Sequence, residues 1–383
     1  MQTLENWTKF LKPFNSRLMK FFWILLLGLL LIACETSKDE PTDASEETSL
    51  YFPPLNTEEW QRASPGDLGW NPSALDELLS FLEDNNTRAF IVLKDGKIVI
   101  ENYFGNNILN TSAFDQNTRW YWASAGKTLT ASLVGIAQTE GFLNLDDPSS
   151  DYLGNGWTSL PAEKEALIQI KNQLSMTTGL EYDVDDLNCT LPSCLTYNTD
   201  ASEQWYYHNA PYTLLEKVVE NATGVDYNTY TDQKIESTLG MNGEWISQGF
   251  NQVYWSTARD MARFGLLMLN QGRWEDTDVL SDNSYYDLML NSSQSLNPSY
   301  GYLWWLNGKE SIIIPDLPNS FNSSLSENAP ADLMAGMGKN GQFVEVIPSK
   351  NLVVIRMGEA PEASLVPLAF HDEMWGKINQ VID

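Results

Sequence analysis

The sequence predicts an α+β fold, in which a mainly antiparallel sheet is flanked by helices and a helical subdomain is inserted. Three observations lead to this prediction. Strand-like apolar runs occur near both ends of the folded part, helical periodicity dominates the region between them, and no internal repeat is visible. Because the strands come from both ends of the chain, we expect one mainly antiparallel sheet with the helical region beside it.

The first predicted elements are a helix and a β-hairpin. Residues 73–82 begin with a serine cap and place four leucines on one face, which predicts an amphipathic helix. The apolar runs 89–93 and 98–100 flank Asp95-Gly96, a dipeptide that favours a tight hairpin turn.

Helical patterns then continue from about residue 125 to 290. One predicted helix covers about 124–138, and a second follows Ser256-Thr257 and ends near Gly272. Strands are predicted again at 301–306, 342–347 and 352–355, before a final helix in 365–381. We therefore assign a folded domain to 58–383, with its sheet-containing part at about 58–140 and 296–383 and its helical part at about 141–295.

The N-terminal segment indicates export. Basic residues precede an apolar run over 21–33, which is shorter than the roughly 20 residues of a membrane-spanning helix, so residues 1–33 are predicted as a signal peptide. Leu31-Ile-Ala-Cys34 resembles the lipobox of bacterial lipoproteins, which implies lipidation of Cys34 and an anchor in the bacterial cell envelope. An ordinary secretory signal is the alternative. Residues 34–57 are acidic and polar and predict a solvated tether.

Composition excludes several classes of function. The chain has 23 basic and 51 acidic residues and a formal net charge of −28, which repels nucleic acids and anionic lipid surfaces. Membrane attachment is therefore expected only through the N-terminal lipid. With two histidines and no His-Glu-x-x-His motif, we expect no metal site and no cofactor. Cys189 and Cys194 are close enough in sequence for a local disulfide, with two free thiols as the alternative.

Ser124 and Lys127 form the only Ser-x-x-Lys motif of the chain. Residues three apart share a helix face, so the hydroxyl and the ammonium can meet. A serine at a helix N-terminus lies where backbone N–H groups favour developing negative charge, and a buried lysine loses proton affinity and can act as a base. The alternative is two polar groups on a solvated helix, but the flanking apolar residues argue for burial.

Two further motifs carry polar groups that suit a cleft. Tyr207-His-Asn209 combines a phenol with a carboxamide, although Asn209 ahead of Ala210-Pro211 also fits a helix cap. Lys339-Asn-Gly341 precedes an alternating strand and fits a hairpin turn. In a functional interpretation, Lys339 lines the cleft and the backbone N–H of Gln342 points at a substrate carbonyl.

A Ser-His-Asp triad is the competing arrangement. Trp122-Ala-Ser-Ala-Gly126 retains only the final glycine of the Gly-x-Ser-x-Gly turn, with tryptophan in place of the first glycine. His208 and His371 are the only histidines that could serve as its base.

The order of the three motifs resembles the class C β-lactamase, penicillin-binding-protein and esterase family of serine hydrolases. The local sequence around these motifs is most similar to the 6-aminohexanoate-dimer hydrolase and esterase branch, and the resemblance covers roughly residues 60–383. Five further stretches fit the family: 174–180, 238–241, 256–260, 300–305 and 341–348. The family has an antiparallel sheet, a helical subdomain and a cleft between them, which agrees with the fold predicted from the residues.

The resemblance implies a role for each candidate residue. Ser124 is the nucleophile, Lys127 helps to deprotonate and orient it, and Tyr207 carries the proton to the leaving group. Asn209 contacts the substrate amide and Lys339 supplies positive charge.

Two backbone positions complete the expected site, because the N–H groups of Ser124 and Gln342 would form an oxyanion hole. Asn340 replaces the threonine or glycine that the family usually has between Lys339 and Gly341, so efficient β-lactam turnover is not expected.

We therefore expect a serine hydrolase that acts on a small-molecule ester, amide or lactam through an acyl-Ser124 intermediate. A non-catalytic receptor or binding lipoprotein on the same scaffold is the alternative. A peptidoglycan D,D-peptidase would share the chemistry and differ only in its substrate.

Overall fold

The structure is a computed structural model that describes residues 50–55, 57 and 59–382. The predicted signal peptide, Cys34 and nearly all of the predicted tether lie outside the described residues. Within the described residues, no helix is long and apolar enough to cross a lipid bilayer.

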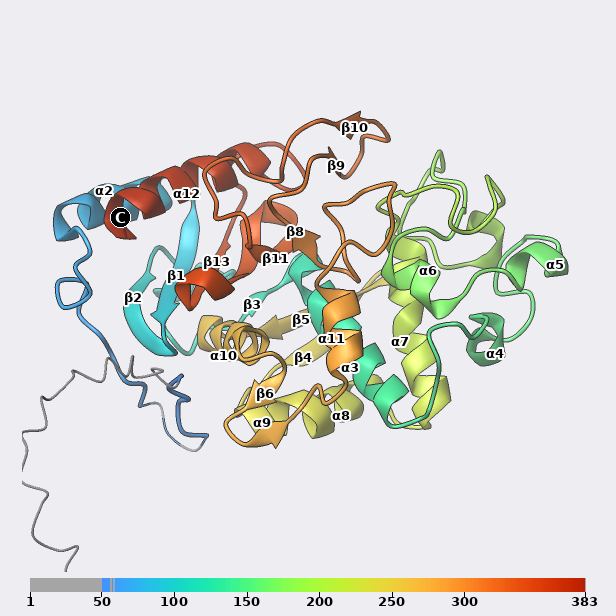
Figure 1. The fold of residues 1–383 in the computed structure, drawn as a ribbon, viewed down its shortest axis with the longest axis horizontal. Helices are drawn as coiled ribbons and strands as arrows, with labels where there is room; N and C mark the ends of the chain where they lie inside the picture. The colour runs from blue at the N-terminus through green and yellow to red at the C-terminus, as the bar shows by residue number, and fades with distance from the viewer. Residues whose placement is uncertain (1–49, 56, 58, 383) are drawn as a thin grey trace, which may run out of the picture. The chain divides into compact units, whose positions relative to one another are not determined.

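A six-stranded antiparallel sheet organises the domain, as predicted (Figure 1). Its strands run in the order β2-β1-β13-β12-β11-β8. Their bounds are β1 Thr87–Lys94, β2 Lys97–Tyr103, β8 Trp305–Leu306, β11 Met334–Gly338, β12 Gln342–Ile347 and β13 Leu352–Gly358. Because β1 pairs with β13, the two ends of the folded chain meet in the middle of the sheet.

Helices cover both faces of this sheet (Figure 1). On one face, α2 (Pro72–Asp84) packs beside α12 (Leu368–Ile382), where the rings of Phe81 and Phe370 stack with centroids 5.4 Å apart. On the other face, α10 (Ala258–Leu269) presents Gly265, where a β-carbon would lie 2.5 Å from Val353 Cγ1. The close approach of α10 therefore depends on a glycine at this position.

The helical region lies beside the sheet and carries most of the remaining elements (Figure 1). Its α-helices are α3 Lys127–Thr139, α4 Ser150–Leu153, α5 Ala162–Glu165, α6 Ile170–Leu174, α7 Asn209–Thr223, α8 Tyr227–Thr231, α9 Ser237–Leu239 and α11 Asn283–Met289. Short helical turns are η1 Ala123–Gly126, η2 Pro192–Cys194, η3 Asp232–Glu236, η4 Lys339–Gly341 and η5 Pro348–Lys350.

Small antiparallel sheets complete the fold. One has the order β3-β5-β4, and two hairpins pair β6 with β7 and β9 with β10. Their bounds are β3 Trp120–Tyr121, β4 Glu244–Gln248, β5 Asn251–Ser256, β6 Arg273–Trp274, β7 Thr277–Asp278, β9 Ile312–Ile313 and β10 Ser320–Phe321. The region from 125 to 290, predicted to be mainly helical, thus also contains strands.

Several predicted elements differ from the structure in detail. The predicted helix over 124–138 begins as a 3₁₀ turn and becomes α-helical only at Lys127. The prediction of a strand over 301–306 was wrong except for Trp305–Leu306, because Leu303 has a left-handed φ of 63° and its N–H donates to the carbonyl of Leu174. Asn209 is the first residue of α7 rather than its cap, which is His208.

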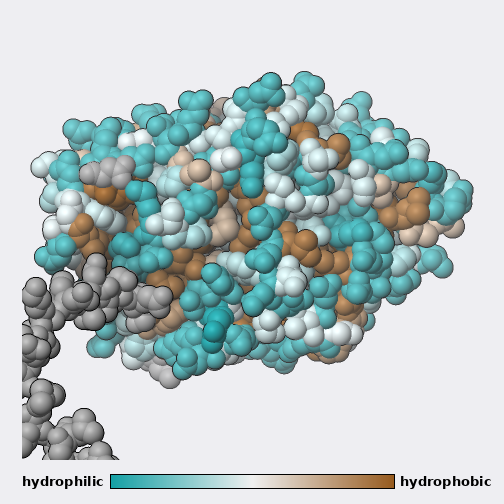
Figure 2. Space-filling model, viewed as in Figure 1, coloured by the Kyte–Doolittle hydropathy of each residue, from teal (hydrophilic) through white to brown (hydrophobic). Residues whose placement is uncertain are grey.

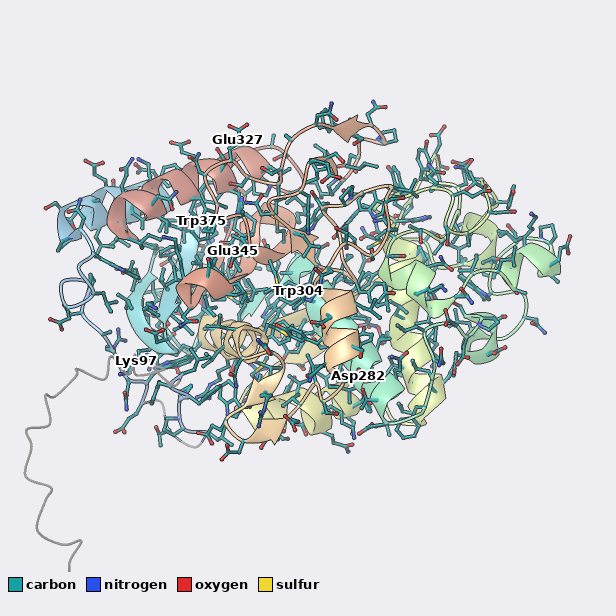
Figure 3. The ribbon with its side chains drawn as sticks, in the orientation of Figure 1. Lys97, Asp282, Trp304, Glu327, Glu345 and Trp375 are labelled. Carbon is teal, nitrogen blue, oxygen red and sulfur yellow. A yellow bond between two sulfur atoms is a disulfide. The ribbon has the colours of Figure 1, made fainter. Side chains whose placement is uncertain are left out.

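The face beneath α12 contains a buried polar group. Glu345 of β12 and Trp375 of α12 lie close together (Figure 3), and Trp375 Nε1 donates to Glu345 Oε2 at 3.1 Å. His371 Nε2 contacts the other carboxylate oxygen of Glu345, and both side chains are fully buried. This histidine is therefore committed to the packing of α12.

Candidate active site

The turn that carries Ser124 is held between the start of α3 and strand β11. Trp122, just before it, is buried and donates from Nε1 to Ser256 Oγ at 2.8 Å. Ala123 has a φ of 48°, a left-handed value that only a constrained turn imposes on alanine. At Gly338, a β-carbon would lie 3.0 Å from the backbone nitrogen of Ser124, so β11 needs glycine there to approach the turn.

Lys127 is buried against Ser124. Its side chain is 3% exposed, and Nζ donates to Ser124 Oγ at 3.0 Å and to Asn209 Oδ1 at 2.9 Å. The ammonium also lies 4.0 Å from the ring centroid of Tyr212 and 5.1 Å from that of Tyr207. Burial lowers the pKa of Lys127 from 10.5 to about 7, because the charged form is poorly solvated. Near neutral pH, Lys127 therefore exists in both its charged and its neutral form.

Tyr207 forms the opposite side of this polar cluster. It is 5% exposed, and its ring stacks on Trp305 with centroids 5.9 Å apart. Burial raises the pKa of Tyr207 well above 10, although its hydrogen bond with Ser124 acts in the opposite direction. The phenol thus keeps its proton near neutral pH and is suited to donate it.

Asn209 connects Lys127 to Asn188, a residue that the sequence analysis did not single out, in the loop that carries the predicted Cys189–Cys194 disulfide. Its Nδ2 donates to Asn188 Oδ1 at 3.0 Å, and Asn188 Nδ2 donates in turn to Asp186 Oδ1 at 2.8 Å. Asn188 lies next to Cys189, which is joined to Cys194 by a disulfide. No motif in the sequence points to Asn188, because its contact with Asn209 spans 21 residues.

A cavity of about 550 Å³ opens onto these groups. Five predicted residues line it: Ser124, Lys127, Tyr207, Asn209 and Lys339. Its wall also includes Asp185, Asp186 and Asp316, so the cavity contains charges of both signs. The structure therefore brings the three sequence motifs together around one space.

Gly341 and Gln342 are buried behind this cavity. The side chain of Gln342 bonds to the backbone of Gly358 in both directions, with Nε2 2.6 Å from the carbonyl oxygen and Oε1 3.0 Å from the nitrogen. The Gln342 carboxamide thus fastens β12 to β13, which leaves the backbone N–H as the only predicted substrate contact of this residue.

Residues 339–341 form the turn between β11 and β12, in which Gly338 pairs with Gln342. Asn340 has a left-handed φ of 64° and donates from Nδ2 to the Tyr121 hydroxyl at 2.7 Å. The buried guanidinium of Arg356 donates to the carbonyls of Asn340 and Gly341. The turn that presents Lys339 to the cavity is therefore fixed from both sides.

Neither histidine of the chain is placed to form a triad with Ser124. His371 is paired with Glu345 beneath α12, and His208 is 3% exposed and absent from the cavity wall. Burial lowers the pKa of His208 to about 4. The side chain that donates to Ser124 Oγ is that of Lys127, and Tyr207 also bonds to Ser124. In the described part of the chain, no group of three His, Cys, Asp or Glu side chains is arranged to hold a metal ion.

An antiparallel sheet with a helical region beside it, and a buried Ser–Lys pair facing a cavity, define a hydrolase-like scaffold of the serine β-lactamase and penicillin-binding-protein kind. The Beta-lactamase family model matches residues 83–361, and the chain belongs to this family.

Its relatives are distant in sequence and similar in fold. The chain is 21% identical to a 6-aminohexanoate-dimer hydrolase of Paenarthrobacter ureafaciens over 333 residues, which cover 75% of this chain and 76% of the relative. A solved candidate 6-aminohexanoate-dimer hydrolase of Bacillus anthracis superposes with a TM-score of 0.64 at 19% identity, covering 86% of this chain and 89% of the other. A penicillin-binding protein of Bacillus halodurans gives 0.58 at 17% identity, covering 79% and 99%. These structural likenesses establish the fold.

Proposed function

We propose that this member of the β-lactamase family is a serine hydrolase that opens a small ester, amide or lactam through an acyl-enzyme on Ser124. The observation that carries the proposal is the buried contact of 3.0 Å between Lys127 Nζ and Ser124 Oγ. Because burial lowers the pKa of Lys127 to about 7, a neutral amine is available near neutral pH to take the serine proton.

During acylation, Lys127 accepts a proton and Tyr207 donates one. Ser124 Oγ attacks the substrate carbonyl carbon while its proton passes to neutral Lys127. Tyr207, which is neutral, donates its proton to the leaving group, and the proton that Lys127 took from Ser124 then passes to Tyr207. Water then attacks the acyl carbon, releases the acid and returns the proton to Ser124.

Other residues bind the substrate and its developing charge. We assign the oxyanion hole to the backbone N–H groups of Ser124 and Gln342. Asn209 contacts the substrate amide with the amide hydrogen that it does not give to Asn188. Lys339, which is exposed and lines the cavity, attracts an anionic part of the substrate.

We also propose that the mature chain is a lipoprotein of the bacterial cell envelope, anchored by a lipid on Cys34. The acidic tether 34–57 would separate the folded domain from the lipid. The lipobox-like end of the apolar segment supports this. Radiolabelled palmitate should be incorporated into the full chain and not into a Cys34→Ala variant. Equal incorporation in both would refute lipidation at this residue.

A fluorophosphonate probe tests the enzymatic proposal. The full chain should be labelled on a single serine, identified as Ser124 by mass spectrometry, and Ser124→Ala should abolish labelling. Ser132→Ala is the matched control, because Ser132 lies on α3, is buried, and bonds to the carbonyl of Thr128 away from the cavity. Absence of labelling in the unmodified chain across pH 6 to 9 would contradict the proposal.

A non-catalytic binding role on the same scaffold would leave Ser124 without a working base, and the Lys127 contact argues against it. A panel of nitrophenyl esters, short amides, β-lactams and D-Ala-D-Ala peptides separates the substrate classes. Preferential turnover of the peptides would assign the chain to the D,D-peptidases.

A further inference from the structure

The loop at residues 186–189 is attached to the first turn of α7. The N–H of Ala210 donates to the carbonyl of Leu187 at 2.9 Å, and Asn209 Nδ2 donates to Asn188 Oδ1 at 3.0 Å. Within the loop, the N–H of Cys189 donates to the carbonyl of Asp186 at 3.1 Å. The loop therefore contacts Asn209, the residue that bonds to Lys127, through the side chain of Asn188, and it contacts the next residue, Ala210, through its backbone.

The hydrogen bonds from this loop to Ser124 have a fixed direction. A carboxylate accepts hydrogen bonds, so Asp186 Oδ1 takes both the backbone N–H and the Nδ2 of Asn188. Asn188 must then turn its Oδ1 toward Asn209. Asn209 turns its Nδ2 to Asn188 and hence its Oδ1 to Lys127, whose ammonium has only hydrogens to donate.

The disulfide closes the chain immediately after Asn188. Cys189 and Cys194 are five residues apart, and Cys189 is 6% exposed. Leu191, at the tip of the closed loop, is exposed, so apolar packing of the tip does not hold the loop in place. The covalent link therefore restrains the chain directly on the C-terminal side of Asn188.

We propose that Asn188 is a positioning residue for Lys127, acting through the carboxamide of Asn209, and that the Cys189–Cys194 disulfide holds Asn188 in place. The inference rests on the proposed function of Ser124 and Lys127. Without Asn188, the carboxamide of Asn209 is free to rotate and can turn its Nδ2 toward Lys127. Two donors then face each other, and the amine loses the acceptor that keeps it beside Ser124 Oγ.

The first test measures the titration of Lys127 directly and does not require enzymatic activity. In the full chain with ¹³C-labelled lysine, the titration of Lys127 is followed by NMR and assigned with Lys127→Met. Asn188→Ala should lower the titration midpoint, because loss of the acceptor disfavours the ammonium. Asn198→Ala is the matched control, since Asn198 makes a similar partly buried bond to Gln204 and should leave the midpoint unchanged. An unchanged midpoint in Asn188→Ala would overturn the inference.

Reduction of the disulfide gives a second route to the same readout if Asn188→Ala folds poorly. Unmodified protein treated with a phosphine reductant should show a lower Lys127 midpoint, while its circular dichroism remains that of the oxidised protein. A midpoint equal to that of the oxidised protein, with the thiols shown to be free, refutes the role of the disulfide.

Labelling of Ser124 by the fluorophosphonate separates this inference from the proposed function. Asn188→Ala and the Cys189→Ser/Cys194→Ser pair should each slow labelling about 10-fold, the cost of one lost hydrogen bond in a charged network. Because the disulfide is proposed to act through Asn188, a chain that combines all three substitutions should be labelled no more slowly than Asn188→Ala alone. If the fold-reductions in labelling rate multiply in the combined variant, or if Asn188→Ala and the double cysteine variant are both labelled at the normal rate, the inference is wrong. A chain that shows the midpoint shift but is never labelled refutes the acyl-enzyme and keeps the positioning role.

Discussion

Lys127 and Arg356 are both buried basic residues. In the described part of the chain, the acceptors of their hydrogen bonds are hydroxyl, carboxamide and backbone carbonyl oxygens rather than carboxylates. Lys127 faces the cavity and has two oxygen acceptors, Ser124 Oγ and Asn209 Oδ1. Arg356 lies behind the cavity and donates to four backbone carbonyls and to a hydroxyl, those of Asn340, Gly341, Asn85, Glu359 and Thr87. The two sites thus differ in how fully the charge is solvated by the protein.

The difference decides which cation can react. Burial lowers the pKa of Arg356 to about 9, so its guanidinium stays charged at neutral pH and fixes the turn at 339–341. Burial lowers the pKa of Lys127 to about 7, so its amine can release and accept a proton there. Exclusion of water lowers the pKa of both side chains. The number of hydrogen-bond acceptors and the access to the cavity then distinguish Arg356, which has a structural role, from Lys127, which can exchange a proton.

The change Lys127→Met would test this contrast most strongly. It should slow labelling of Ser124 about 1,000-fold, because the general base is lost. It should also raise the free energy of unfolding by about 1 kcal/mol, since a poorly solvated charge is removed. Labelling kinetics and urea denaturation at pH 7 measure the two effects. Lys217→Met, which removes an exposed lysine paired with Glu220, is the control and should change neither by much.

Arg356→Met should move stability in the opposite direction. It leaves several buried carbonyls without donors and should lower the free energy of unfolding by about 3 kcal/mol. Urea denaturation at pH 7 checks this, with circular dichroism as the signal. If Arg356→Met and Lys127→Met shift stability with the same sign, the distinction between the two buried cations fails.

Tyr207→Phe sharpens the assignment of the proton donor. Hydrolysis of amides should slow about 100-fold, because an amine leaving group needs a proton, whereas nitrophenyl esters should slow less than about 10-fold. Steady-state rates for a matched ester and amide with one acyl group make the comparison. Equal losses on both substrates would mean that Tyr207 is not the donor to the leaving group.

The pH dependence tests the shift in the pKa of Lys127 itself, and its effect within any one pH unit is small. Labelling should rise as pH increases through about 7, as the neutral amine forms. Between about 7 and the ordinary lysine value of 10.5, the unfolded chain binds more protons than the folded one. The contribution of Lys127 to the free energy of unfolding should therefore rise with pH in this window, by up to about 1 kcal/mol per pH unit.

The cost of burying Lys127 is fully present below pH 7 and disappears above 10.5. Subtracting the values for Lys127→Met at each pH isolates this contribution. A flat difference across the window would show that Lys127 retains its ordinary pKa.

Local patterns predicted the elements whose sequence carries their own signal. The Asp95-Gly96 hairpin, the capped helix α10 and the alternating strand β12 were all confirmed. Strand β11 was missed, because Met-Ala-Gly-Met-Gly has no strand-like alternation and is paired only through its neighbours β12 and β8. The surface visible in Figure 2 is mostly hydrophilic with hydrophobic residues at several places between, which agrees with the strong acidic composition.

For the site, residue spacing predicted the contact between Ser124 and Lys127, because three positions along a helical turn place both groups on one side. The partners of Asn209 and of the turn at 339–341 could not be predicted. Asn188 and Arg356 reach them from distant parts of the chain, and a single sequence contains no sign of such pairs.

The close approach of Gly338 to the backbone of Ser124 has a consequence for biogenesis. The serine and lysine are synthesised long before strand β11, which lies on the far side of the helical region in the sequence. A nascent chain therefore carries Ser124 on a turn that lacks its contact with β11 until that strand has left the ribosome and paired with β12. The acyl-enzyme chemistry proposed above therefore requires the C-terminal strands, and we expect a chain that ends before β11 to lack it.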